Sequence, residues 1–228
     1  LMLEGKEVFL NLLFQRLFAG IDSFPLMALP FFILAGEMMT SGGVTMRIVA
    51  FANALIGHLR GGLAHVTVCS SVMLAGGCGS AVADASALGS IMIPAMRSSG
   101  YTNRFASAVV AASAVIVSII PPSGIFILYA FIMNVSVAAM FAAGVIPGLM
   151  IAAGLMIVIA IRGRMENFPQ SDKRASMAVV ATTFRQAFLP LLTPVILIGG
   201  IIGGLFTPTE AAAVAAVYSM ILGVFYTK

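Results

Sequence analysis

The chain has 228 residues, of which 61% are hydrophobic and only 9% are charged, and its mean hydropathy is +1.10. Because soluble globular proteins carry about 25% charged residues, this composition excludes a water-soluble domain and indicates an integral membrane protein with several spans. The formal net charge of +4 does not indicate a nucleic-acid partner, since the basic residues lie between hydrophobic runs, where they act as topology signals.

Residues 105–161 decide between helices and a barrel. They contain no Asp, Glu, Lys or Arg, and the run is long enough for two helices of ~20 residues. Strands of a membrane barrel alternate apolar and polar residues over ~10 positions, and no such alternation is visible. We therefore expect an all-α polytopic membrane protein that is embedded in the lipid bilayer.

Residues 1–60 are expected to form N-terminal scaffold helices. Residues 1–20 mix charged residues with Leu and Phe at helical spacing, which favours an amphipathic helix at the membrane interface. Residues 24–39 predict the first span, with a kink at Pro30, where the helical hydrogen bonding is interrupted. After a Ser-Gly-Gly turn, residues 44–60 predict a weaker helix that either spans the membrane or lies in the interface.

Residues 61–100 predict a re-entrant hairpin. Two short apolar limbs flank a tip of small residues, 76–84, that carries a single carboxylate, Asp84. Each limb is short for a span, which needs ~20 residues, and a non-helical tip at membrane depth is tolerated only inside protein or beside a wet cavity. The tip is therefore a candidate binding site.

Residues 105–133 predict a broken helix. Its two pieces, 105–118 and 125–133, are separated by the sequence PPSG at positions 121–124. The double proline removes two hydrogen-bond donors and forbids a continuous helix, so the chain must unwind near the middle of the membrane.

A long span at residues 136–161 follows the broken helix, and its G-x-x-x-G pattern at Gly144 and Gly148 favours close approach of a neighbouring helix. Together, residues 61–160 are expected to hold the transport elements of a first structural repeat.

Residues 162–185 form the one clearly polar loop, and it is basic. The positive-inside rule places this loop in the cytoplasm, and counting back along the spans puts both ends of the hairpin there as well. Residues 161–228 are then this loop and the start of a second repeat, with spans at 186–204 and 209–226.

The sequence at residues 203–223 echoes that at residues 19–36, because each has a polar turn with proline before an apolar helix. We expect the two copies to have opposite orientations, as in an inverted repeat. Inverted repeats, broken helices and a site at the bilayer midplane are the joint signature of secondary transporters.

Several long segments also occur in a recognisable order: QRLFAGIDSFPLMALPFFILAGEMM, GHLRGGLAHVTV, GSAVADASALGSIMIPAM, IIPPSGIFILYA, MFAAGVIPGLM and GGLFTPTEAAAVAAVY. In these segments the chain resembles the large membrane subunit of tripartite ATP-independent periplasmic (TRAP) transporters, the DctM-like permeases. The resemblance covers nearly the whole chain, which corresponds to about half of a usual large subunit. The second hairpin and second broken helix of the family are not part of it.

The resemblance implies an elevator-type transporter in the bacterial inner membrane, with scaffold helices and a mobile transport domain, and no enzymatic activity. It implies sodium-coupled import of an organic acid, such as a C4-dicarboxylate or a sialic-acid-like carboxylate. The implied partners are a periplasmic substrate-binding protein and a small, DctQ-like membrane subunit, and sodium is the coupling ion, with no other cofactor.

The candidate sodium site combines the hairpin tip with the break in the facing helix. Small residues at the tip let carbonyl oxygens turn toward a dehydrated cation, and hard cations prefer oxygen ligands. An acid inside the membrane is costly and generally functional, but Asp84 has the alternative role of capping the second limb. The candidate ligands are Gly79, Ser80, Asp84, Pro121 and Ser123.

The candidate substrate contacts lie where the second half of the broken helix begins. The free N–H groups and positive dipole end of a half-helix suit a carboxylate, although a proline kink that only packs against the hairpin would give the same sequence. The candidates are Ser80, Pro122, Ser123 and Gly124.

Other polar residues have structural explanations. Ser86 and Ser90 either face the cavity or bond to their own helix, and Thr207 with Glu210 predicts a capped helix start. His58 and His65 have no partner at ligand spacing, so no transition-metal site is expected. The arginines at positions 47, 97 and 104 favour topology and lipid headgroup contacts over a substrate clamp.

Two other functions fit parts of the pattern. A single-component, ion-coupled carboxylate carrier of related two-hairpin architecture would work without a binding protein. An intramembrane aspartic protease would use Asp84, but it needs a second acid at membrane depth, and the other acids lie at span ends or in loops.

Overall fold

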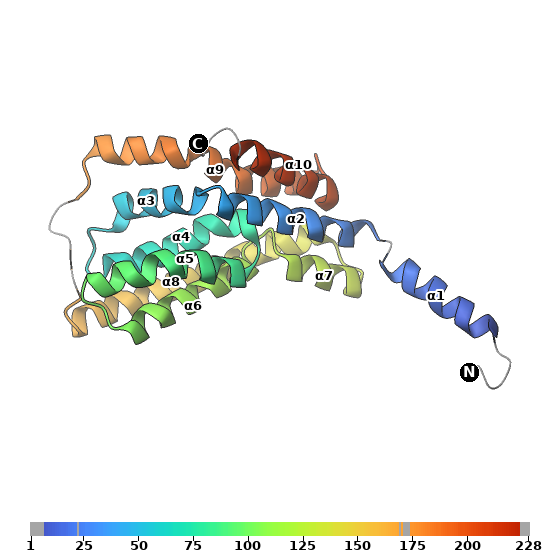
Figure 1. Cartoon of the computed structure of the whole chain (residues 1–228), viewed down its shortest axis with the longest axis horizontal. Coiled ribbons are helices and arrows are strands. Elements are labelled where there is room, and N and C mark those ends of the chain that lie inside the picture. The colour runs from blue at the N-terminus through green and yellow to red at the C-terminus, as the bar shows by residue number, and fades with distance from the viewer. Residues whose placement is uncertain (1–6, 22, 169, 171–173, 224–228) are drawn as a thin grey trace.

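The computed structural model describes residues 7–21, 23–168, 170 and 174–223. Among these residues there is no β-strand, and the regular structure is helical (Figure 1). The helices are α1 (Glu7–Ile21), α2 (Phe24–Ser41), α3 (Val44–Ile56), α4 (Gly62–Cys78), α5 (Ala81–Ser98), α6 (Asn103–Ile119), α7 (Gly124–Met133), α8 (Val137–Met165), α9 (Met177–Ile202) and α10 (Pro208–Ile221).

Several of the helices have the length and composition of membrane spans, which confirms the predicted all-α membrane protein. Within the described residues, α8 and α9 are each long and apolar enough to cross a bilayer. The bent pairs α2 with α3 and α6 with α7 pass the same test when each pair is taken as one span, with bends of 68° and 43°.

The weaker helix predicted at residues 44–60 is α3, which forms a bent pair with α2. The interruption lies at Gly42 and Gly43, where Gly43 has a φ of 71°, a left-handed conformation that glycine adopts without steric cost. Pro30, in contrast, lies inside α2, which runs on past it to Ser41.

The α4–α5 hairpin enters and leaves the bundle at one end, and its re-entry into a membrane stays a prediction. At that end the Tyr101 ring lies 4.9 Å from the Phe168 ring, centroid to centroid, and a Cβ on Gly61 would lie 3.5 Å from the same phenylalanine. The connection between α8 and α9 lies at this end too, whereas the hairpin tip ends inside the bundle (Figure 1).

The break between α6 and α7 lies at residues 120–123, as the double proline predicts. It packs onto α8 through the predicted G-x-x-x-G pattern, because a Cβ on Gly144 would lie 2.5 Å from the Ile119 carbonyl oxygen. A Cβ on Gly148 would contact the Ile120 side chain. The close approach predicted for this pattern is confirmed.

The prediction that residues 203–223 are an inverted copy of residues 19–36 is wrong. Helices α2 and α10 run side by side in the same direction (Figure 1), and a Cβ on Gly223 would lie 3.8 Å from the Met38 carbonyl oxygen, so both helices end at the same level. What the two segments share is a helix start, a polar N-cap followed by proline in the first turn. That signal is local and does not depend on orientation.

The polar loop between the last long spans is also shorter than predicted. Helix α8 continues to Met165, with an ion pair of 2.7 Å between Arg162 and Glu166 on its last turn. Helix α9 begins at Met177, where the Ser176 hydroxyl accepts a hydrogen bond from the Val179 N–H at 3.3 Å. Several basic residues assigned to the loop therefore lie on helix ends.

Helix α1 lies apart from the bundle and confirms the predicted N-terminal helix over the part that the structure describes (Figure 1). Five of its apolar side chains are exposed: Leu12, Leu13, Phe14, Leu17 and Phe18. The first six residues of the predicted 1–20 helix, and residues 224–226 of the predicted last span, lie outside the described residues.

Candidate functional site

The hairpin tip touches the break in the facing helix. Gly79, one of the two residues between α4 and α5, has a φ of 57°, and a Cβ at this position would lie 2.5 Å from the Pro122 carbonyl oxygen. Real Cβ atoms do not come this close to backbone, so only glycine lets the two unwound segments meet here.

A cavity of about 350 Å³ opens beside this contact. The tip contributes the first residues of α5, and the break contributes the end of α6 and the start of α7. Helix α2 closes the third side. The lining residues are Leu29, Phe32, Ile33, Gly79, Ser80, Ala81, Val82, Ser118, Gly124 and Ile125.

Two half-helices begin at this cavity. Ala81 and Val82 start α5, and Gly124 starts α7. The first N–H groups of a helix have no partner within it, and the helix dipole is positive at this end. Two such ends facing one cavity make an electropositive surface that suits the carboxylate of an organic acid.

Ser80 is the N-cap of α5, and its hydroxyl oxygen accepts a hydrogen bond from the Ala83 N–H at 3.4 Å. A serine hydroxyl can donate while it accepts, so its proton stays available to a bound oxygen. Of the predicted residues, Ser80, Gly79 and Gly124 line the cavity.

Pro121, Pro122 and Ser123 are buried behind the cavity wall. The Ser123 hydroxyl donates to the Ser118 carbonyl oxygen at 2.6 Å, which bridges the break. In this conformation, Ser123 therefore holds the shape of the break, and Ser118 is the serine that lines the cavity.

Asp84 lies one turn into α5 and does not line the cavity. Its side chain is 2% exposed, and its Oδ2 accepts a hydrogen bond of 2.8 Å from the Ser71 hydroxyl on α4. Its Oδ1 is buried and has no hydrogen-bond partner among the described residues. The alternative in which Asp84 caps α5 is wrong, because Ser80 is the cap.

Among the remaining polar candidates, Ser90, Thr207 and Glu210 have the structural roles considered for them. Ser86 and Ser90 are exposed, and the Ser90 hydroxyl donates to the Ala87 carbonyl oxygen of its own helix at 2.8 Å. Thr207 and Glu210 form a complete capping box. Within the described part of the chain, no group of three His, Cys, Asp or Glu side chains could hold a metal ion.

Three features of the site were missed from the sequence: the α2 wall, Ser118 and Ser71. A weak signal existed for Ser71, which with Ser70 forms a pair of adjacent polar residues in a mostly apolar limb, opposite the only acid of the hairpin. Ser118 and the α2 residues carry no such signal, since their role depends on how the helices pack.

Comparison with known proteins decides the family. A model described as "Tripartite ATP-independent periplasmic transporter, DctM component" matches residues 1–228. The chain belongs to this family. The resemblance seen in its sequence segments is thereby confirmed, and because members of the family are transporters rather than enzymes, the protease alternative is set aside.

The relatives include permeases named for different acids. The chain is 44% identical over 214 residues to "Sialic acid TRAP transporter permease protein SiaT" of Haemophilus influenzae, covering 94% of this chain and 35% of the relative. It is 44% identical over 218 residues to the sialic acid large permease SiaM of Vibrio cholerae, covering 94% and 50%. It is 43% identical over 210 residues to the C4-dicarboxylate large permease DctM of Pseudomonas aeruginosa, covering 92% and 49%. The chain thus spans half or less of the length of these relatives.

Proposed function

We propose that this chain is part of the large permease subunit of a sodium-coupled transporter that imports an organic acid across the bacterial inner membrane. The observation that carries the proposal is the cavity at which the hairpin tip, the broken helix and α2 meet, with two half-helix N-termini on its wall. Discontinuous helices of this kind form the substrate sites of secondary transporters. The names of the relatives support a sialic acid or a C4-dicarboxylate as substrate.

The substrate carboxylate binds at the starts of α5 and α7. Ser80 and Gly124 contact it directly, and Pro122 and Ser123 shape the turn that presents the α7 N-terminus. Because α2 supplies only apolar groups to this cavity, the rest of the substrate packs against Leu29 and Phe32 there.

Sodium binds between the hairpin limbs and the break. Asp84 supplies the negative charge through its unpartnered Oδ1, and the backbone at Gly79 and Pro121 supplies carbonyl oxygens, with Ser80 and Ser123 beside them. A buried carboxylate with one unsatisfied oxygen is costly to leave alone, which supports a bound cation as its partner.

Residues 1–60 serve as scaffold, and residues 61–160 move as the transport element of an elevator-type cycle, with residues 161–228 opening the second repeat. The hairpin is re-entrant from the cytoplasm, where the basic ends of the hairpin and the α8–α9 connection lie together (Figure 1). A periplasmic binding protein delivers the substrate, and a small membrane subunit completes the transporter.

The test is uptake by the full permease that carries this chain, reconstituted in proteoliposomes with its small subunit. We expect uptake of a sialic acid or a C4-dicarboxylate that requires both an inward sodium gradient and the added binding protein. Uptake without the binding protein would favour the single-component carrier. Uptake at the same rate with and without a sodium gradient would show that sodium is not the coupling ion.

A further inference from the structure

A cavity of about 490 Å³ lies away from the site above, between α6 and α8. Its charged rim lies at the end of the bundle where the hairpin begins and ends, beside the Tyr101–Phe168 contact. Its depth runs along the apolar faces of the two helices.

Two helical stripes form the walls of this groove. On α6, Arg104 is followed at intervals of one turn by Ala108 and Ala112; on α8, Leu155 and Val158 lead to Arg162. Residues three or four apart share one helix face, so both stripes place a guanidinium at the same end and apolar side chains below it. The small side chains of the alanines leave room for an extended apolar group to lie along α6.

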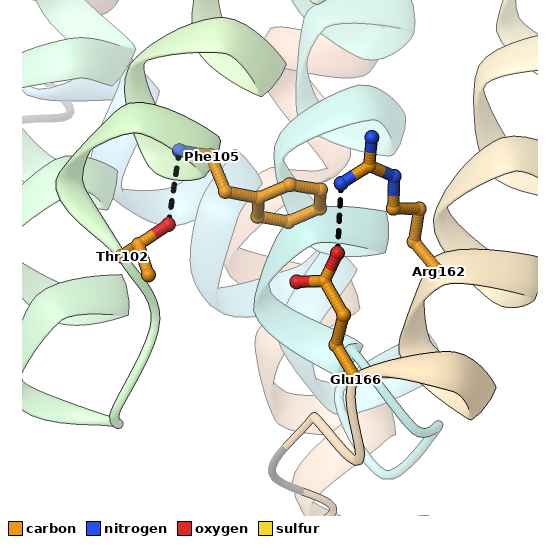
Figure 2. A network of polar contacts seen from close by, with 4 residues as sticks. All are labelled: Thr102, Phe105, Arg162 and Glu166. Atoms are coloured by element: carbon orange, nitrogen blue, oxygen red, sulfur yellow. Dashed lines mark hydrogen bonds and ion pairs between the residues drawn. The ribbon is translucent and has the colours of Figure 1, made fainter.

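The charged residues at the rim are Arg104, Arg162 and Glu166, so the rim has a net positive charge. Arg162 is paired with Glu166 through a 2.7 Å contact, and Figure 2 shows the Phe105 ring pointing toward this pair. Arg104 is exposed and makes no ion pair or hydrogen bond within the residues that the structure describes. The Thr102 hydroxyl is used by α6 itself, since it accepts a hydrogen bond from the Phe105 N–H at 3.3 Å (Figure 2).

From this arrangement we propose that the α6–α8 groove binds an anionic phospholipid. Arg104 and Arg162 hold the phosphate, and one acyl chain lies along Ala108, Ala112 and Val158. Basic pockets between membrane helices bind anionic headgroups, and the net charge of one at the rim matches a single phosphate. A soluble anion would use the rim but not the apolar floor, which opens sideways through exposed Val158.

The proposal is tested by binding of phosphatidylglycerol to the purified full permease in detergent, counted by native mass spectrometry. We expect wild type to bind phosphatidylglycerol more tightly than phosphatidylcholine. Arg104→Gln should weaken binding about fivefold, the loss typical of one arginine at an anionic surface, and Ala112→Phe should do the same by filling the floor. The matched control is Arg97→Gln, an exposed arginine at the same end of the bundle that does not line the groove.

The outcomes separate the sources of the anion. The proposal is overturned if wild type binds the two lipids equally, or if the Arg104→Gln variant binds phosphatidylglycerol as tightly as wild type. It is also overturned if another part of the permease fills the groove. If glycerol phosphate competes for the site as well as the lipid does, and Ala112→Phe does not change binding, the rim binds a soluble anion instead. Because the readout is lipid binding, failure here leaves the transport proposal standing.

Discussion

The Ser71 hydroxyl donates a 2.8 Å hydrogen bond to the Asp84 carboxylate and so joins the two limbs of the hairpin well inside the bundle. Ser71 is fully buried, and Asp84 is 2% exposed. The bond satisfies one carboxylate oxygen and leaves Oδ1 for another partner.

Ser71→Ala is therefore expected to destabilise the permease by about 1–3 kcal/mol, because it leaves a buried acceptor without its donor. The measurement is thermal unfolding of the purified protein in detergent. Ser90→Ala is the matched control, since that exposed serine bonds only within α5. Equal unfolding temperatures for the two variants would show that the bond does not hold the limbs together.

Asp84→Asn and Ser80→Ala are expected to raise the sodium concentration for half-maximal uptake, the first by about tenfold, as the loss of one charged ligand would do. The measurement is initial uptake rate against sodium concentration in proteoliposomes. Ser86→Ala, on the exposed face of the same helix, should leave the curve unchanged. Unaltered sodium dependence in both test variants, at normal expression, removes these residues from the site.

Gly79→Ala is expected to reduce uptake far more than Gly204→Ala. Both glycines have positive φ, 57° and 71°, so alanine costs about 1–2 kcal/mol of backbone strain at either position. Only at Gly79 does the new Cβ meet another segment, the Pro122 carbonyl oxygen, whereas nothing lies within 4 Å at Gly204. Similar uptake by the two variants would show that the contact between tip and break does not matter for transport.

The two ends of the bundle are expected to lie on opposite sides of the membrane. In a background in which Cys69 and Cys78 are replaced by serine, Arg174→Cys should react with an impermeant maleimide only from the cytoplasmic side. Val135→Cys, in the α7–α8 connection at the other end (Figure 1), should react only from the periplasmic side. The same sidedness for both cysteines would contradict the proposed topology.

The hairpin and the broken helix could be predicted because their signals are local. A double proline forbids a helix wherever it lies, and glycine with serine between two apolar limbs marks a turn. The contact between Gly79 and Pro122 follows the expected pairing of these two segments.

The partner of Asp84 could not be predicted in the same way. Whether α4 turns Ser71 or another residue toward α5 depends on the rotation of one helix against the other, which is fixed by packing rather than by spacing. The prediction of the orientation of α10 was wrong for a related reason. Thr207 and Pro208 specify how a helix starts but not which way it runs in the bundle.

The shared direction of α2 and α10 sets a parity rule for the chain between them. Taking each bent pair as one span, the chain passes along the bundle with α2–α3, α6–α7, α8 and α9 before α10 begins, which is an even number of crossings. The α4–α5 hairpin returns to the end at which it started, so it adds none. A helix that runs opposite to α2 must instead follow an odd number of crossings, as α9 does. An inverted repeat within this chain would therefore have to align α2 with a helix such as α9 rather than with α10.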